Sequence, residues 1–173
     1  RVVCCGGDGT LSEVLAGAAY SNSKVPVGLI PLGSTNDFAK NMHIPKNTVI
    51  ATLIAAGHKF IDYDIGTLNG KPFSYIAAVG AFTEVSYSAP QKLKNTFGHF
   101  AYILEGAKSI TNIKPIKMDI SFDGKHISGD YIYASVSNTY SVGGVVMLDK
   151  KDVRFDDGSF ELLLVKQPKT NAE

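Results

Sequence analysis

The sequence predicts a mixed α/β fold that starts as a parallel sheet with crossover helices and continues as mostly antiparallel strands. Two observations predict it. Apolar runs alternate with helical segments through residues 1–58, the order typical of parallel strands joined by helices. Beyond residue 58, apolar and polar residues alternate with a period of two, which favours antiparallel strands. We therefore expect an incomplete α/β domain at 1–58 and a mostly β domain at 59–173 that is incomplete at its carboxyl end.

The first predicted strand and helix meet at a glycine-rich turn. Residues 2–5 form a short apolar run that leads into glycine, which is typical of a strand buried on both faces. Thr10 and Glu13 have the spacing of a capping box, in which each side chain bonds the backbone N–H of the other residue. We therefore expect a helix over residues 11–20.

The rest of the first domain repeats this order. The apolar residues 26–31 predict a second strand. The polar stretch 32–37 has the capping residues that begin a helix, and we expect a short one that runs through Asn41. Residues 48–57 predict a further helix that ends at Gly57.

The second domain is predicted to hold five strand-like segments and one helix. In residues 117–122, apolar and polar side chains alternate strictly, and the pair Asp123-Gly124 that follows is favoured in two-residue hairpins. An apolar stripe with helical spacing predicts the helix at 99–110. The strand-like segments are 59–68, 71–79, 117–122, 126–137 and 160–166.

Composition excludes several classes of protein. The chain of 173 residues is 45% hydrophobic and 19% charged, which is globular composition. Its net charge of +1 argues against a nucleic-acid partner, because such proteins usually carry a basic excess. No apolar run approaches the ~20 residues of a membrane span. The two cysteines are adjacent, so a disulfide framework is excluded and a reducing, cytoplasmic setting is expected.

The turn GGDGT at residues 6–10 has the features of a phosphate site. Its glycines let another molecule approach the backbone, and the start of the following helix favours an anion. A plain tight turn is the simpler interpretation of the glycines, but it leaves Asp8 unexplained. The lysine of a P-loop is missing, and Ser12 stands where a dinucleotide-binding turn needs glycine. A carboxylate beside phosphate is repulsive unless a cation lies between them, so Asp8 indicates a Mg²⁺–nucleotide.

A second turn of the same kind follows the next predicted strand, in IPLGSTNDFAK at residues 30–40. Ordinary helix capping explains any one of its polar residues. It does not explain two acid-bearing turns on consecutive strands. Because the carboxyl ends of parallel strands meet at one edge of a sheet, we expect both turns to contribute to one ligand site.

Together, GGDGT and PLGSTNDFAK resemble the bacterial diacylglycerol kinase and lipid kinase family, which includes the sphingosine kinases. The resemblance continues through residues 85–108 and 155–165. It implies an ATP-binding α/β lobe, a β-sandwich lobe, and transfer of the γ-phosphoryl of Mg-ATP to a lipid hydroxyl, with diacylglycerol giving phosphatidic acid. Two other functions stay open: a kinase of a soluble acceptor, similar to NAD kinases, and a non-catalytic nucleotide-binding module.

The resemblance also implies roles for individual residues. Asp8 and Asp37 correspond to the family's catalytic acids. Ser34 stands where the family usually has threonine. The residues expected to bind the nucleotide are Gly6, Gly7, Asp8, Gly9, Thr10, Leu11, Ser12, Gly33, Ser34 and Asn36. A structural Mg²⁺ is implied at the Asp157 carboxylate and the backbone carbonyls of Arg154 and Ser159, although Asp157-Gly158 also reads as a plain turn.

The resemblance sets further expectations about the whole protein. A family strand with a glycine loop is expected before Arg1, and the family's general-base glutamate after Glu173. We therefore expect a fragment that is inactive by itself. The expected partners are ATP and the lipid, with transient membrane-surface contact. The lysine-rich segment 90–117 is a candidate for this contact, and a solvated amphipathic helix whose aromatic residues lie in the core is the alternative interpretation of the segment. The expected location is cytoplasmic and peripheral to the membrane, and a homodimer is one option for the assembly.

Overall fold

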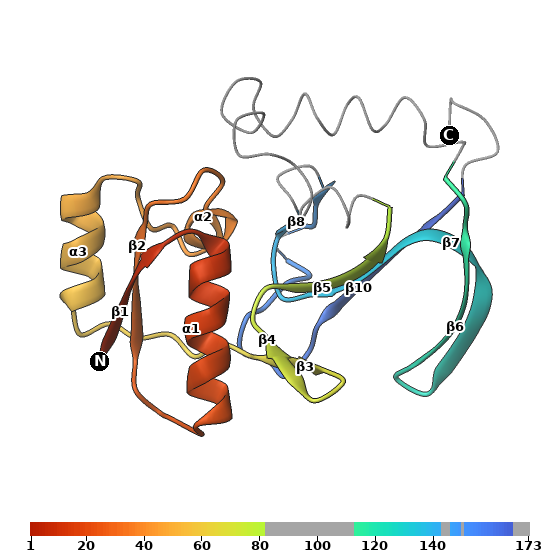
Figure 1. Ribbon diagram of the computed structural model, residues 1–173, viewed down its shortest axis with the longest axis horizontal. Coiled ribbons are helices and arrows are strands. Elements are labelled where there is room, and N and C mark those ends of the chain that lie inside the picture. The colour runs from red at the N-terminus through yellow and green to blue at the C-terminus, as the bar shows by residue number, and fades with distance from the viewer. Residues whose placement is uncertain (82–112, 143–145, 150, 168–173) are drawn as a thin grey trace. The chain divides into compact units, whose positions relative to one another are not determined.

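The chain forms a mixed α/β fold in two compact units. Figure 1 shows it as a computed structural model that describes residues 1–81, 113–142, 146–149 and 151–167. Unit 1 comprises Arg1–Ala77 and Ser137–Glu161, and unit 2 comprises Ala78–Val136 and Leu162–Glu173. Unit 1 therefore takes in residues on both sides of position 58, where the pattern of the sequence changes.

Unit 1 contains a pair of parallel strands. β1 (Val2–Gly6) runs beside β2 (Val27–Pro31), as the apolar runs predicted. Gly28 faces Ala55 of α3 (Thr48–Ala56), whereas the next residue, Leu29, lies in a buried cluster with residues of β1 and α1 (Asp8–Tyr20). Successive strand residues point to opposite faces, so α1 and α3 cover opposite faces of the pair, as Figure 1 shows.

β1 is less buried than we expected. Val2 and Val3 are 45% and 47% exposed, Cys5 is exposed as well, and of residues 2–5 only Cys4 is buried. The prediction of a strand buried on both faces was therefore wrong. The exposure of β1 follows from its tertiary contacts. α3 packs chiefly on β2 rather than on β1, and among the described residues β1 pairs with β2 alone.

α1 begins earlier than the sequence predicted. Its first residue is Asp8, its N-cap is Gly7, and no side chain caps it. The N–H of Leu11 already donates to the Gly7 carbonyl at 3.1 Å, so Thr10 lies inside the first turn. The predicted capping box between Thr10 and Glu13 was wrong, because both residues are within the helix.

The other two helices of unit 1 agree with the prediction. α3 ends with Gly57 as its C-cap, and the Asn47 carboxamide oxygen caps its start by accepting from the N–H groups of Val49 and Ile50. α2 (Asp37–Asn41) is a single short helix that ends at Asn41. The side chain of its N-cap residue, Asn36, makes no capping hydrogen bond. The free N–H groups at the start of α2 therefore need acceptors from other parts of the chain.

A four-stranded sheet makes up most of the described part of unit 2. The strand order is β10-β7-β5, with β6 paired to β7. β6 and β7 form the predicted hairpin, and Asp123 and Gly124 have positive φ values of 47° and 73°, as a type I′ turn needs. The bounds are β5 (Ile76–Gly80), β6 (Ile116–Phe122), β7 (Lys125–Ser137) and β10 (Glu161–Lys166).

Two short antiparallel pairs complete the described strands. They are β3 (Gly66–Leu68) with β4 (Lys71–Phe73), and β8 (Ser141–Val142) with β9 (Val146–Met147). The strand expected over 59–68 is therefore limited to its last three residues. The β-sandwich stays a prediction.

Two expectations concern residues largely beyond the described ranges. The predicted helix at 99–110 lies outside them, as does most of the lysine-rich segment 90–117. Within the described part of the chain, none of the helices has the length and apolar character needed to cross a lipid bilayer.

The close packing of α3 on β2 predicts the effect of one added methyl group. A Cβ on Gly28 would lie 2.8 Å from the Ala55 Cβ and 3.1 Å from its Cα. We expect Gly28→Ala to push α3 from the sheet and to lower the free energy of unfolding by about 1–3 kcal/mol, as over-packing usually does. Urea denaturation of the purified protein measures it.

Gly17 provides the matched control for this prediction. It is exposed within α1, and a Cβ there meets nothing within 4 Å. Gly17→Ala should raise stability by about 0.5–1 kcal/mol, because glycine weakens a helix interior. Equal effects of the two substitutions would contradict the packing account.

Candidate functional site

The two glycine turns lie against each other at the carboxyl ends of β1 and β2. A Cβ on Gly33 would lie 2.5 Å from the Gly7 Cα, and a Cβ on Gly7 would lie 3.1 Å from the Gly33 Cα. Only glycine permits this approach of one backbone to the other. The expectation that both turns meet at one edge of the sheet is therefore confirmed.

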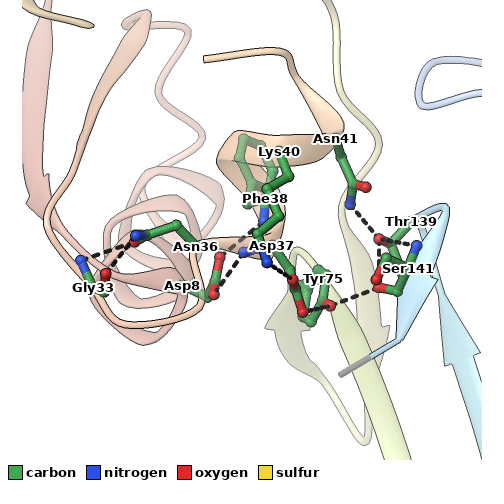
Figure 2. A network of polar contacts seen from close by, with 10 residues as sticks. All are labelled: Asp8, Gly33, Asn36, Asp37, Phe38, Lys40, Asn41, Tyr75, Thr139 and Ser141. Atoms are coloured by element: carbon green, nitrogen blue, oxygen red, sulfur yellow. Dashed lines mark hydrogen bonds and ion pairs between the residues drawn. The ribbon is translucent and has the colours of Figure 1, made fainter. Parts of the chain in front are cut away.

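The Asp8 carboxylate joins the first turn to α2. Its Oδ2 accepts a hydrogen bond from the Asp37 N–H at 3.0 Å, and its Oδ1 accepts one from the Phe38 N–H at 2.9 Å (Figure 2). Asp8 lies in the first turn of α1 and bonds the first turn of α2. Negative charge is favoured at a helix N-terminus, so both helices stabilise this carboxylate.

This contact changes the explanation of Asp8. We expected a cation beside Asp8 because a carboxylate next to a phosphate is repulsive. The two backbone donors are a second reason for a carboxylate at this position, one that needs no ligand. Each carboxylate oxygen retains a further lone pair, and a role for Asp8 beside a Mg²⁺–nucleotide stays a prediction.

Asn36 closes the second turn. Its backbone is left-handed, with φ of 52°, and its side-chain oxygen accepts from the Gly33 N–H at 2.8 Å. Its side-chain nitrogen donates to the Gly33 carbonyl. Both polar atoms of this buried side chain are therefore engaged with Gly33 (Figure 2). Ser34, on the same loop, is exposed.

The other residues expected to bind phosphate lie at or near the start of α1. Gly9 is exposed, and a Cβ there would meet no atom within 4 Å, so the space beside it is open. The Thr10 side chain packs over Gly6. Ser12 is half-buried. Leu11 is only 3% exposed and belongs to the core, so its side chain does not face a ligand.

The second predicted acid, Asp37, is a buried carboxylate with two side-chain partners. Its side chain is 4% exposed. Its Oδ1 lies 3.0 Å from Lys40 Nζ, and its Oδ2 lies 3.1 Å from the Tyr75 hydroxyl. A buried charge needs such partners to offset its lost hydration. Neither partner was predicted, although Lys40 is three residues along the same helix, a spacing typical of an ion pair.

The polar contacts continue from Asp37 into residues 139–141. The Tyr75 hydroxyl lies 2.7 Å from the Ser141 carbonyl, and the Thr139 hydroxyl donates to the same carbonyl at 2.9 Å. The Thr139 oxygen accepts from the Ser141 N–H at 3.1 Å and from the Asn41 side chain (Figure 2). These contacts tie α2 to the carboxyl-terminal part of unit 1, and no local pattern in the sequence predicted them.

Aromatic rings support α2 from within unit 1. The ring centroids of Phe38 and Tyr63 lie 5.0 Å apart, and Phe155 continues the cluster 5.7 Å from Tyr63. The Tyr63 hydroxyl contacts the carbonyls of Ser74 and Asn138 at 2.6 and 2.7 Å. Burial, together with the nearby charges of Glu161 and Asp64, raises the pKa of Tyr63, so the phenol remains a donor.

The turn at which the structural Mg²⁺ is predicted is closed by two hydrogen bonds, one within the turn and one to Asp64. The Asp157 Oδ1 accepts from the Ser159 N–H at 2.9 Å, and the Asp64 Oδ2 accepts from the Gly158 N–H at 2.6 Å. Gly158 has φ of +74°, and Arg154 pairs with Asp156 at 3.6 Å. The plain-turn interpretation accounts for these contacts. A Mg²⁺ at the oxygens of Arg154, Asp157 and Ser159 stays a prediction, with a donor set of the hard oxygens that this ion prefers.

The capping role of Asp8 predicts a loss of stability as well as of any activity. Asp8→Ala removes both acceptors for the first turn of α2, so we expect it to lower the free energy of unfolding by about 1–2 kcal/mol. Asp8→Asn keeps one acceptor and should cost less. Chemical denaturation measures both. Glu13→Ala, an exposed change in the same helix, is the control, and equal stability of the two alanine variants would contradict the capping role.

Glu161 predicts a pH dependence of stability. Burial, and then the charge of Asp157, raise its pKa above the ordinary 4.5, partly offset by hydrogen bonds from its own N–H and that of Thr139. Between the ordinary and the raised pKa the folded state binds more protons than the unfolded state, so stability falls as pH rises through that window. Relative to Glu161→Gln, the wild type should therefore become less stable as the pH rises from the ordinary pKa of 4.5 through the raised pKa of Glu161. Unfolding at a series of pH values measures this, and a flat difference would contradict it.

Known proteins that are similar to this chain are diacylglycerol kinases. Residues 1–68 match the family described as diacylglycerol kinase catalytic domain. The chain is 37% identical to the diacylglycerol kinase of Bacillus subtilis (strain 168) over 96% of its own length and 55% of that protein. It is 36% identical to the diacylglycerol kinase of Staphylococcus aureus (strain JH9), over 96% of the chain and 52% of that protein.

A solved structure gives the same result. The crystal structure of a diacylglycerol kinase from Bacillus anthracis str. Sterne matches with a TM-score of 0.70 and 27% identity, covering 95% of this chain and 53% of that one. The chain thus spans about half the length of the proteins it matches. Within that half, residues 1–68 match the diacylglycerol kinase catalytic domain, and the sequence and fold of the chain are similar to those of diacylglycerol kinases.

Proposed function

We propose that this protein is an ATP-dependent lipid kinase, which transfers the γ-phosphoryl of Mg-ATP to the hydroxyl of diacylglycerol and yields phosphatidic acid. The observation that carries the proposal is the junction of the two glycine turns, with Asp8 bonded across it to α2. The names of the relatives support diacylglycerol as the acceptor of the phosphoryl group, since these relatives are diacylglycerol kinases.

The start of α1 is the proposed phosphate site. α1 has 13 residues and no side-chain cap, so the N–H groups of its first turn can bond a phosphate oxygen. The open space beside Gly9 leaves room for that phosphate. The exposed Ser34 hydroxyl is available to the nucleotide on the adjacent turn.

Asp8 and Asp37 would hold the Mg²⁺ of the nucleotide through the lone pairs that their hydrogen bonds leave. Bound there, the ion would neutralise charge on the β- and γ-phosphates as the phosphoryl group moves. The hydroxyl oxygen of the lipid forms a bond to the γ-phosphorus, the bond from that phosphorus to the bridging oxygen of ADP breaks, and the hydroxyl proton passes to a base. We assign this base to no described residue.

Three secondary proposals accompany this function. A structural Mg²⁺ would bind at Asp157 and the carbonyls of Arg154 and Ser159. The protein would work in the cytoplasm and touch the membrane surface transiently to reach its lipid. No nucleic-acid partner is proposed, because the net charge is only +1.

The decisive experiment uses the protein expressed from its complete gene. Labelled ATP is supplied with diacylglycerol in mixed micelles, with other lipids and with NAD, each with Mg²⁺ or with a chelator. Labelled phosphatidic acid that requires Mg²⁺ would support the proposal. Labelled NADP would identify a kinase of a soluble acceptor, and ATP binding without transfer to any acceptor would identify a non-catalytic nucleotide-binding module.

The proposed phosphate site predicts the effect of filling the space beside Gly9. Gly9→Ala adds a methyl group that touches nothing in the protein, so stability should be kept or raised. The same methyl group would crowd a phosphate at the start of α1, and we expect at least a tenfold loss of Mg-ATP affinity, about 1.4 kcal/mol. Binding of a fluorescent ATP analogue measures it.

Gly17→Ala is the control, because it makes the same change in the same helix away from its start. It should bind Mg-ATP as the wild type does. Unchanged affinity in Gly9→Ala would place the nucleotide phosphates elsewhere.

A further inference from the structure

The hydroxyl of Tyr75 has a single proton and lies between two acceptors. The Asp37 Oδ2 is 3.1 Å away and the Ser141 carbonyl oxygen is 2.7 Å away (Figure 2). A phenol can donate one full hydrogen bond, so the two oxygens compete for it. Which of them receives the proton decides whether the buried carboxylate has a donor from Tyr75.

Thr139 decides that competition. Its oxygen already accepts from the Ser141 N–H at 3.1 Å and from the Asn41 side-chain nitrogen. Its own proton is therefore directed to the Ser141 carbonyl, 2.9 Å away. With one lone pair of that carbonyl already engaged by Thr139, the Tyr75 proton is directed to Asp37, whose negative charge makes it the stronger acceptor although the carbonyl is nearer.

We infer that Tyr75 and Thr139 are positioning residues for Asp37. Tyr75 donates to the carboxylate and fixes its orientation, and Thr139 keeps the phenolic proton on Asp37 by satisfying the competing carbonyl. The inference rests on the proposed function, in which Asp37 holds the metal ion of the nucleotide.

The surroundings of Asp37 explain why this donor matters. The only other side chain bonded to its carboxylate among the described residues is Lys40, which is 53% exposed and carries its charge on a flexible stem. Tyr75, in contrast, is held on both sides of its hydroxyl. A carboxylate that must present a fixed lone pair to a metal ion needs such a rigid partner.

The first test does not depend on the proposed function. A double-mutant cycle compares Tyr75→Phe, Asp37→Asn and the double variant by chemical denaturation. A hydrogen bond to a buried carboxylate should appear as coupling of roughly tenfold in the unfolding equilibrium constant. Additive effects would mean that Tyr75 does not donate to Asp37, and would overturn the inference.

The second test uses the kinase assay and Mg²⁺-dependent binding of a fluorescent ATP analogue, with the complete protein. Tyr75→Phe should lower kcat by roughly tenfold, change KM for the lipid by less than about twofold, and raise the Mg²⁺ concentration for half-maximal nucleotide binding. Thr139→Val should act in the same direction. Thr139→Ser keeps the hydroxyl and should restore wild-type behaviour.

The two positioning residues act through one proton, so their effects should not multiply. The variant with both Tyr75→Phe and Thr139→Val should be no worse than Tyr75→Phe. Tyr63→Phe is the matched control, because it removes a phenol that contacts the Ser74 and Asn138 carbonyls and not Asp37. It should lower stability and leave kcat unchanged.

The outcomes separate the two proposals. If the wild type neither binds Mg-ATP nor transfers phosphate, the proposed function is wrong and the positioning role fails with it. If the wild type is active and Tyr75→Phe keeps its kcat and Mg²⁺ dependence, or if Tyr63→Phe loses as much kcat, only the inference about Tyr75 and Thr139 is wrong.

Discussion

The hydrogen bonds that the Asp8 carboxylate accepts from the N–H groups of Asp37 and Phe38 hold the candidate site together. They connect residues 29 and 30 positions apart in the sequence and place the starts of α1 and α2 beside each other. The contact is possible only because Gly7 and Gly33 let the two turns touch without side chains between them. One carboxylate thus receives the favourable dipoles of two helices.

The position of α2 depends on contacts with residues that are distant in the sequence. A helix of five residues is too short to be stable by itself. Asp8 binds its start, Phe38 anchors it in the aromatic cluster, and Asn41 at its end bonds Thr139. Ala39 of α2 joins the apolar cluster of Cys4, Leu11 and Leu29, but much of what surrounds the rest of this helix is buried and polar. Buried hydrogen bonds have stricter geometry than apolar contacts, so this arrangement suits a site that must be held in one conformation.

The two acids that stabilise the candidate site, Asp8 and Asp37, are also the acids proposed to hold the metal ion. Asp8 caps a helix, and Asp37 is a buried carboxylate with a cation and a phenol as partners. Loss of activity on replacing either would therefore mix two causes, a displaced α2 and a missing metal ligand. Stability must be measured beside activity in each variant, and replacing a neighbour such as Tyr75 separates the causes better because it leaves both acids in place.

The sequence by itself determined the parallel strands and helices of residues 1–58, the hairpin of β6 and β7, and the meeting of the two glycine turns. These depend on local signals, such as the Asp123-Gly124 hairpin and the end of α3 at Gly57, and on the rule that parallel strands end at one edge. Only the tertiary structure decided the exposure of β1, the partner of Asp8, and the linkage of Asp37 through Tyr75 to Ser141. The reason is distance along the chain: hydrogen bonds between residues 38, 66 and 98 positions apart leave no trace in the spacing of nearby residues.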